Sequence, residues 1–178
     1  NNKWDINQTN SLQIHSTMSA HTFKGIILLI KTMKILKNQF WNVKINIAGN
    51  FDESQIGNFA KKLIIKENLK KNIVFLGKCN SKQIVESMLN SRVFVLFSYI
   101  ENSPNSLQEA QCIGMPCIAA FTGGIPSLIE DGKTGLLYPA GDEAYIAGRI
   151  SELFENKEYA KELGDKAYKM ANKRNNPN

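Results

Sequence analysis

Two glutamates on either side of a predicted helix start are the residues best placed to do chemistry. Glu101 lies in a polar loop and Glu109 within the helix, and Pro104 between them has the fixed φ and missing amide hydrogen that suit a first helical position. Ser103 is the predicted N-cap, so a helix is expected over residues 104–113. Five helical residues place Glu109 about 7.5 Å beyond Pro104. That offset suits an elongated ligand with hydroxyl groups at both ends, because carboxylates accept hydrogen bonds from hydroxyls.

The first turn of this helix is a predicted anion site. The amides of Asn105, Ser106 and Leu107 lack backbone acceptors there, and the helix macrodipole favours negative charge at that end. A diphosphate bound to these amides would leave Glu101 near one substituent and Glu109 near the other. Taken alone, the two glutamates are better explained as solvated charges of a loop and a helix, so the assignment depends on the surrounding sequence.

The surrounding sequence alternates short apolar runs with amphipathic segments. Residues 93–97 form an unbroken apolar run, which is typical of a strand covered on both faces. Strands are expected at residues 12–16, 43–48, 72–76, 93–97, 116–119 and 135–138, and helices at 24–38, 54–68, 81–90, 104–113, 125–130, 143–154 and 158–173. This alternation predicts an α/β fold, a doubly wound parallel six-stranded sheet of Rossmann-like type. A ligand is expected beyond the carboxyl ends of the strands, where the loops that start at Thr17, Ser98 and Phe121 meet.

The stretch ENSPNSLQEA, followed by GMPCIAA, a Gly-Gly pair and DGKTGLLYPAGD, resembles a known family. It is similar to the C-terminal, donor-binding half of the retaining GT-B glycosyltransferases of family 4, the glycosyl transferases group 1. The E-x7-E motif of that family matches Glu101 and Glu109, and the resemblance runs from about residue 12 to residue 163. It implies that Glu109 holds the ribose diol of a nucleotide diphosphate sugar and that Glu101, at the catalytic position, contacts the donor sugar. No metal is implied.

Three further residues match the family or its backbone requirements. Lys24, which is followed by glycine, matches the lysine that reaches the donor diphosphate. Gly123 and Gly124 permit positive φ and close backbone approach beside the donor, although a plain tight turn is an equal interpretation. The family's loop arginine has no counterpart before Lys24, and His21 or the hydroxyl of Thr17 are the candidates to replace it. A G-x-G-x-x-G motif is also missing from this first turn, which disfavours NAD.

Length and composition indicate one ordinary domain. The chain has 178 residues, 43% hydrophobic and 21% charged, which is enough for a full core. Residues 11–173 are the predicted nucleotide-sugar-binding domain, residues 1–10 a polar linker from a preceding N-terminal domain, and residues 174–178 a polar tail. The sequence shows no transmembrane run or signal peptide, and its three cysteines are odd in number without a C-x-x-C pair. A cytoplasmic location is therefore expected.

The chain carries a net charge of +6, from 22 basic and 16 acidic residues. The basic residues are scattered rather than gathered in a stripe with exposed aromatics, so nucleic acid is a disfavoured partner. Anionic lipid at the inner face of the cytoplasmic membrane is favoured over nucleic acid as the partner of this positive charge. The sequence does not assign that peripheral contact to any particular surface.

Together, residues and resemblance predict the donor-binding half of a retaining glycosyltransferase of the hexosyltransferase class. It would move a sugar from a nucleotide diphosphate sugar to a glycan or lipid-linked acceptor in bacterial surface polysaccharide synthesis, with UDP-sugar favoured over GDP-sugar and no cofactor. The chain alone is expected to bind donor without turnover, because acceptor-side groups belong to the N-terminal domain. A GT-B-fold nucleotide-sugar epimerase and a non-catalytic nucleotide-sugar-binding module are the alternatives. Base, sugar, acceptor and linkage stay open.

Overall fold

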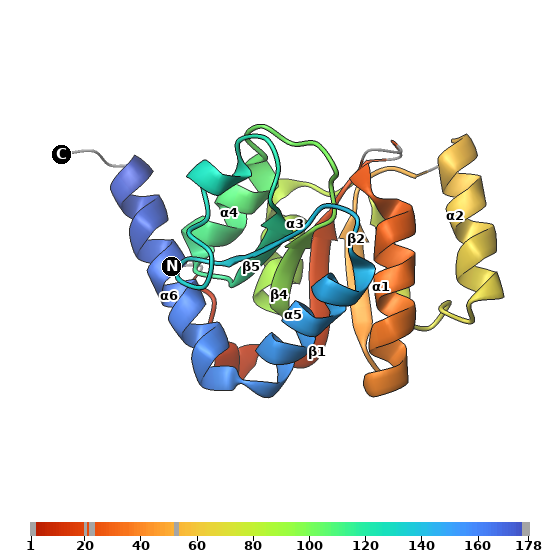
Figure 1. Cartoon of the computed structure of the whole chain (residues 1–178), viewed down its shortest axis with the longest axis horizontal. Coiled ribbons are helices and arrows are strands. Elements are labelled where there is room, and N and C mark those ends of the chain that lie inside the picture. The colour runs from red at the N-terminus through yellow and green to blue at the C-terminus, as the bar shows by residue number, and fades with distance from the viewer. Residues whose placement is uncertain (1–2, 20, 22–23, 52–53, 176–178) are drawn as a thin grey trace.

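Six parallel strands form one sheet in the order β3-β2-β1-β4-β5-β6 (Figure 1). The computed structural model describes residues 3–19, 21, 24–51 and 54–175. The strands are β1 Asn10–Thr17, β2 Lys44–Ala48, β3 Ile73–Gly77, β4 Ser91–Leu96, β5 Cys117–Ala120 and β6 Leu136–Tyr138. The predicted doubly wound six-stranded parallel sheet is confirmed.

Helices cover both faces of the sheet. They are α1 Ile26–Gln39, α2 Gln55–Lys66, α3 Ser81–Leu89, α4 Asn105–Ile113, α5 Glu143–Glu155 and α6 Lys157–Asn175, with short 3-10 helices η1 Ile6–Gln8 and η3 Ile125–Ser127. Figure 1 shows α1 and α5 side by side on one face, with α3 and α4 on the other. Helix α2 packs beside α1 at the β3 edge, and α6 packs on α4 and η1.

The centre of the sheet is apolar, as the sequence pattern requires. Every residue of β4 is buried, because this strand lies between β1 and β5 and is covered on both faces. Local cap signals also hold where a side chain provides them: Asp142 accepts a hydrogen bond from the amide of Tyr145 at the start of α5. The short helix expected at 125–130 is wrong in extent, since only the 3-10 turn η3 forms there.

The N-terminal segment is packed onto the domain, in contrast to the uncompacted linker predicted for residues 1–10. Trp4 and Ile6 are only 5% and 4% exposed, and β1 already begins at Asn10. The Trp4 amide donates to the carbonyl of Ile113 at 2.7 Å, and its indole nitrogen donates to the carbonyl of Ser91 at 2.8 Å. Two large apolar side chains therefore bury this otherwise polar segment.

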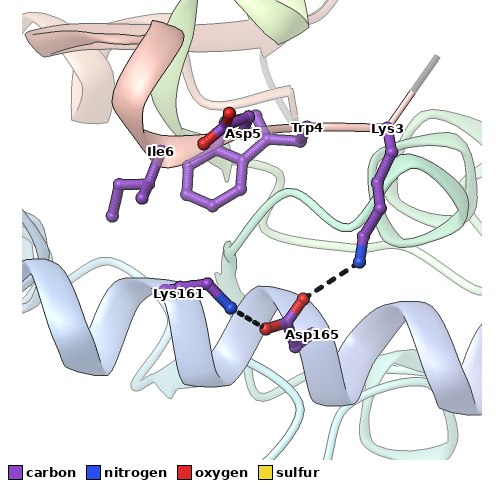
Figure 2. Close-up of a pocket in the computed structure, with 6 residues that line it drawn as sticks. All are labelled: Lys3, Trp4, Asp5, Ile6, Lys161 and Asp165. Carbon is purple, nitrogen blue, oxygen red and sulfur yellow. Dashed lines mark hydrogen bonds and ion pairs between the residues drawn. The ribbon is translucent and has the colours of Figure 1, made fainter.

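Helix α6 holds the same segment from the other side. Figure 2 shows Asp165 on α6 between two lysines, with Lys3 at 3.3 Å and Lys161 in a second ion pair one turn away. The predicted polar tail 174–178 is wrong at its start, because α6 continues to Asn175 and Arg174 donates to the side-chain oxygen of Gln111 at 3.0 Å. Residues 176–178 of that tail lie outside the described residues.

Candidate functional site

The candidate site lies at the carboxyl edge of the sheet, between β1 and β4. The strand order reverses at this point, so the helices that follow the two strands cover opposite faces and leave a crevice between their loops. A cleft of about 410 Å³ opens there, a volume in the range of small-molecule sites. Five of the predicted site residues line this one cleft, namely Lys24, Glu101, Asn105, Ser106 and Glu109.

The start of α4 faces the cleft with its backbone donors unused by the helix. The N-cap is Pro104, which has extended backbone angles and no side-chain oxygen to cap the helix. The first helical hydrogen bond runs from the amide of Gln108 to the carbonyl of Pro104 at 3.3 Å. The amides of Asn105, Ser106 and Leu107 precede it and therefore have no helical acceptor, and the positive end of the macrodipole lies at the cleft.

The predicted N-cap at Ser103 is wrong by one residue. Its hydroxyl instead accepts a hydrogen bond from the side chain of Gln108 at 3.1 Å. A serine cap would have occupied one of the orphan amides, so its displacement leaves them open to a ligand. Leu107 is fully buried and is not among the residues that line the cleft, so of the three predicted amide donors the structure places Asn105 and Ser106 there.

Lys24 and Glu101 form an ion pair across the cleft. The ammonium of Lys24 lies 2.8 Å and 3.0 Å from the two carboxylate oxygens of Glu101, and the side chains are 21% and 18% exposed. Seventy-seven residues separate the two in the chain, so only the crossing of the β1 and β4 loops brings them together. An anion that reaches this lysine must share it with Glu101 or displace that carboxylate.

Gly25 positions Lys24 for this contact. Its φ is +78°, and a Cβ at this position would lie 2.0 Å from the backbone oxygen of Phe97. Only glycine allows the N-terminus of α1 to approach the end of β4 so closely. The Lys-Gly pair is therefore one unit, in which the glycine permits the approach and the lysine carries the charge.

Glu109 completes the charged lining one helical turn from the amides. It takes part in none of the ion pairs among the described residues, unlike Glu101. The cleft therefore holds one lysine and two carboxylates, with the helix amides between them. This arrangement can bind an anionic group at its centre and hydroxyl groups at its ends.

Gly123 and Gly124 pack against the backbone of the loop that carries Glu101. A Cβ on Gly123 would lie 2.0 Å from the carbonyl oxygen of Glu101, and one on Gly124 would lie 2.0 Å from that of Asn102. The amide of Gly124 also donates to the Glu101 carbonyl at 3.2 Å. Of the two interpretations that the sequence left open, the described contacts match a close-packed turn that fixes the loop.

Part of the lining was not predicted from the sequence. Met18, Ser19 and Leu96 line the cleft, as does Thr17, one of the candidates to replace the family's loop arginine. Gly49 lines it too, as its place directly after the predicted strand 43–48 indicates, and a Cβ there would lie 1.7 Å from the carbonyl oxygen of Met18. These residues follow strand ends at the switch point, which is the signal that could have indicated them.

A buried histidine lies on β1 below the cleft. His15 is fully buried, its Nδ1 is 2.8 Å from the hydroxyl of Ser87, and its ring stacks on Phe94. Burial lowers the pKa of His15 to about 4, because the charged imidazolium would lose its hydration. This histidine is therefore neutral near pH 7.

Two features that a site could have are absent from the described residues, a metal-ligand cluster and a membrane-spanning helix. Within the described ranges, no three histidine, cysteine, aspartate or glutamate side chains are grouped so that they could hold a metal ion. No helix in the part of the chain that the structure describes is both long and apolar enough to cross a bilayer.

The fold and site define a Rossmann-like domain with an uncapped helix start at its switch point. The model of the family "Glycosyl transferases group 1" matches residues 3–170, nearly the whole length. The chain belongs to this family.

Curated relatives are longer than this chain. N-acetyl-alpha-D-glucosaminyl L-malate synthase of Bacillus anthracis is 31% identical over 105 residues, which is 59% of this chain and 27% of that protein. The capsular polysaccharide biosynthesis glycosyltransferase CapM of Staphylococcus aureus is 26% identical over 141 residues, 79% of this chain and 36% of that protein. The chain thus spans about a third of the length of these relatives.

Solved structures share the fold at low sequence identity. Anabaena Alr3699/HepE in complex with UDP and glucose superposes with a TM-score of 0.83 at 22% identity, over 95% of this chain and 45% of that one. The C-terminal domain of the glycosyl transferase group 1 protein LpcC from Francisella tularensis has a TM-score of 0.84 at 16% identity, over 97% of this chain and 90% of that domain. The architecture therefore corresponds to the C-terminal half of a GT-B glycosyltransferase.

Proposed function

We propose that the cleft binds a nucleotide diphosphate sugar and that the chain is the donor-binding half of a retaining glycosyltransferase. One observation carries this proposal: the uncapped amides of α4 open into the same cleft as Lys24, Glu101 and Glu109. A diphosphate needs donors and positive charge, whereas a ribose and a hexose need hydrogen-bond acceptors on either side. The cleft offers both along one short helix.

Each group has a distinct role in this proposal. The amides of Asn105, Ser106 and Leu107 hold the diphosphate, and Lys24 adds the positive charge. Glu109 accepts hydrogen bonds from the ribose diol, and Glu101 contacts the hydroxyls of the donor sugar. As the bond to the sugar breaks, negative charge grows on the leaving diphosphate, and the fixed amides stabilise it without rearranging.

The ion pair of Lys24 with Glu101 suits this sequence of events. Before donor binds, each side chain satisfies the other inside a partly buried cleft, where an unpaired charge would be costly. When the diphosphate arrives, it takes over Lys24 and leaves the carboxylate of Glu101 available to the sugar hydroxyls. Donor binding therefore prepares the residue that the transfer step uses.

Relatives support the choice of donor and process. Alr3699/HepE binds UDP and glucose, and CapM is named for capsular polysaccharide biosynthesis. We infer a UDP-sugar in preference to a GDP-sugar, and a role in the assembly of a bacterial surface polysaccharide inside the cell. Because the chain spans about a third of such relatives, its partner in turnover is an acceptor-binding N-terminal domain.

Ligand-observed NMR against UDP-, GDP- and ADP-sugars tests the proposal. We expect a UDP-sugar to bind and to be recovered unchanged after incubation with the chain alone. Failure of every nucleotide sugar to bind would contradict the donor role. Conversion of a nucleotide sugar into its epimer would show that the protein is an epimerase and not a transferase.

A further inference from the structure

The positive charge of this protein is concentrated at one end of the molecule. Residues 34–74 contain eight lysines and three acidic residues, a net charge of +5 in a chain whose total is +6. They comprise the second half of α1, strand β2, helix α2 and the start of strand β3. Figure 1 shows this region beyond α1, at the β3 edge of the sheet and opposite α6.

Helix α2 exposes apolar and basic side chains together on its outer face. Gly57, Ala60 and Ile64 are buried against the domain. On the other side Phe59 is 55% exposed and Ile65 is 56% exposed. Helical spacing places Lys62 and Lys66, both exposed, on the same outer face. The helix contains no acidic residue to neutralise them.

A rigid turn presents a third large apolar side chain near the end of α2. Trp41 is 81% exposed, although a tryptophan normally buries most of its surface. Its carbonyl accepts a hydrogen bond from the side-chain amide of Asn72 at 3.3 Å, and the same amide donates to Val43 at 2.8 Å. Because Asn72 is itself buried, the turn is fixed and the indole is held outward.

Lysines surround this tryptophan as well. A groove beside Trp41 is lined by Lys37, Lys44 and Lys71, together with asparagines and no carboxylate among the described residues. Lys34 pairs with Glu67 at 2.6 Å, just beyond α2, and so ties the end of α1 to the end of α2. The tryptophan turn and the C-terminal end of α2 therefore belong to one surface.

We propose that this surface rests on an anionic lipid bilayer. We call it the α2 face and define it by Trp41, Phe59, Lys62, Ile65 and Lys66. Protruding apolar side chains enter the headgroup region, and lysines around them attract anionic headgroups; stable peripheral binding needs both signals. A soluble anionic ligand would account for the lysines but not for the three exposed apolar side chains Trp41, Phe59 and Ile65.

The placement suits an acceptor held in a membrane, a consequence that rests on the proposed transferase function. Helix α2 follows β2 directly, and Gly49 at the end of β2 lines the donor cleft. A bilayer against the α2 face would lie along the β3 edge of the sheet, and the donor cleft lies further along the same sheet at the carboxyl ends of β1 and β4. The membrane proposal itself depends only on the α2 face and stands apart from donor binding.

Vesicle binding of the purified chain tests it. Of the two tryptophans, Trp4 is buried and Trp41 is exposed, so the fluorescence shift reports mainly on Trp41. We expect phosphatidylcholine vesicles that contain about a quarter phosphatidylglycerol to shift its emission to the blue at about 0.1 M salt, and pure phosphatidylcholine to do so far less. The double substitution Lys62→Glu and Lys66→Glu should weaken binding at least about 30-fold, because each lysine near an anionic surface contributes roughly fivefold.

A control with the same net charge separates the α2 face from the charge of the whole chain. Lys169→Glu with Lys173→Glu, both exposed on α6, also lowers the net charge by four but lies at the opposite end of the molecule. We expect this variant to bind vesicles within about threefold of wild type. Equal losses in the two double variants, or an unshifted Trp41 in sedimenting protein, would overturn the proposal. If a soluble acidic glycan displaced the protein from the vesicles at a concentration lower than that of the anionic lipid, the α2 face would bind that glycan instead.

Discussion

Replacing Glu101 by glutamine should strengthen the binding of bare UDP. The carboxylate of Glu101 accepts hydrogen bonds from the ammonium of Lys24 through both of its oxygens. A diphosphate that uses this lysine must compete with the carboxylate and approach its negative charge. Glutamine keeps the shape of the side chain and one acceptor but removes the charge, so the side chain at position 101 competes less strongly with the phosphate for Lys24.

The size of this effect follows from the burial of the pair. Exposed ion pairs contribute about 0.2 to 1 kcal/mol, and buried hydrogen bonds to charged groups about 1.5 to 3 kcal/mol. Both side chains here are mostly but not fully buried, so the competing interaction is worth about 1 to 2 kcal/mol. The Kd for UDP should therefore fall about 5- to 30-fold in Glu101→Gln.

Isothermal titration calorimetry with UDP measures this directly, and Glu109→Ala is the matched control. That substitution removes a carboxylate from the same cleft but should weaken UDP binding about 10- to 150-fold, because the ribose loses its charged acceptor. The two substitutions thus shift affinity in opposite directions. If Glu101→Gln bound UDP as weakly as Glu109→Ala, the competition for Lys24 would be refuted.

Three further substitutions test the structure around the site. His15→Asn should flatten the pH dependence of unfolding: the unfolded histidine takes up a proton near pH 6.5 and the buried one only near pH 4, so wild type should lose about 2 kcal/mol more than the variant between pH 7 and pH 5 in urea titrations. Gly25→Ala should lower both stability and UDP affinity, because its Cβ would meet the backbone of Phe97, whereas Gly148→Ala on an open helix surface should stabilise the fold by about 0.5 to 1 kcal/mol; equal effects would contradict the strain argument. Arg92→Met should raise the free energy of unfolding by about 1 kcal/mol or more, because two nitrogens of this buried guanidinium have no partner in the described structure; a lower denaturation midpoint would show that the charge is needed.

The fold could be predicted because local signals and topology agree. Apolar runs of strand length alternate with amphipathic helices, and right-handed crossovers leave few arrangements for six such units. The same signals placed the cleft, since the loop that carries Glu101 follows the central strand β4. Side-chain caps such as Asp142 were also visible, because a cap depends on neighbouring residues only.

Other features depend on contacts that a linear pattern does not contain. The pairing of Lys24 with Glu101 joins residues 77 positions apart. Trp4 and Ile6 looked like part of a polar tail because their burial depends on α6, which forms at the other end of the chain. The N-cap of α4 is Pro104 and not Ser103, a shift of one residue that the sequence pattern does not determine. This shift leaves the first amides of the helix without a side-chain cap.

The most direct test of the central claim is to follow the backbone amides of α4 by NMR during titration with UDP and, separately, with uridine. If the diphosphate binds to the start of α4, the amide signals of Asn105, Ser106 and Leu107 will move strongly with UDP and little with uridine. Unchanged signals at saturating UDP, or equal shifts with uridine, would show that the start of this helix does not hold the diphosphate.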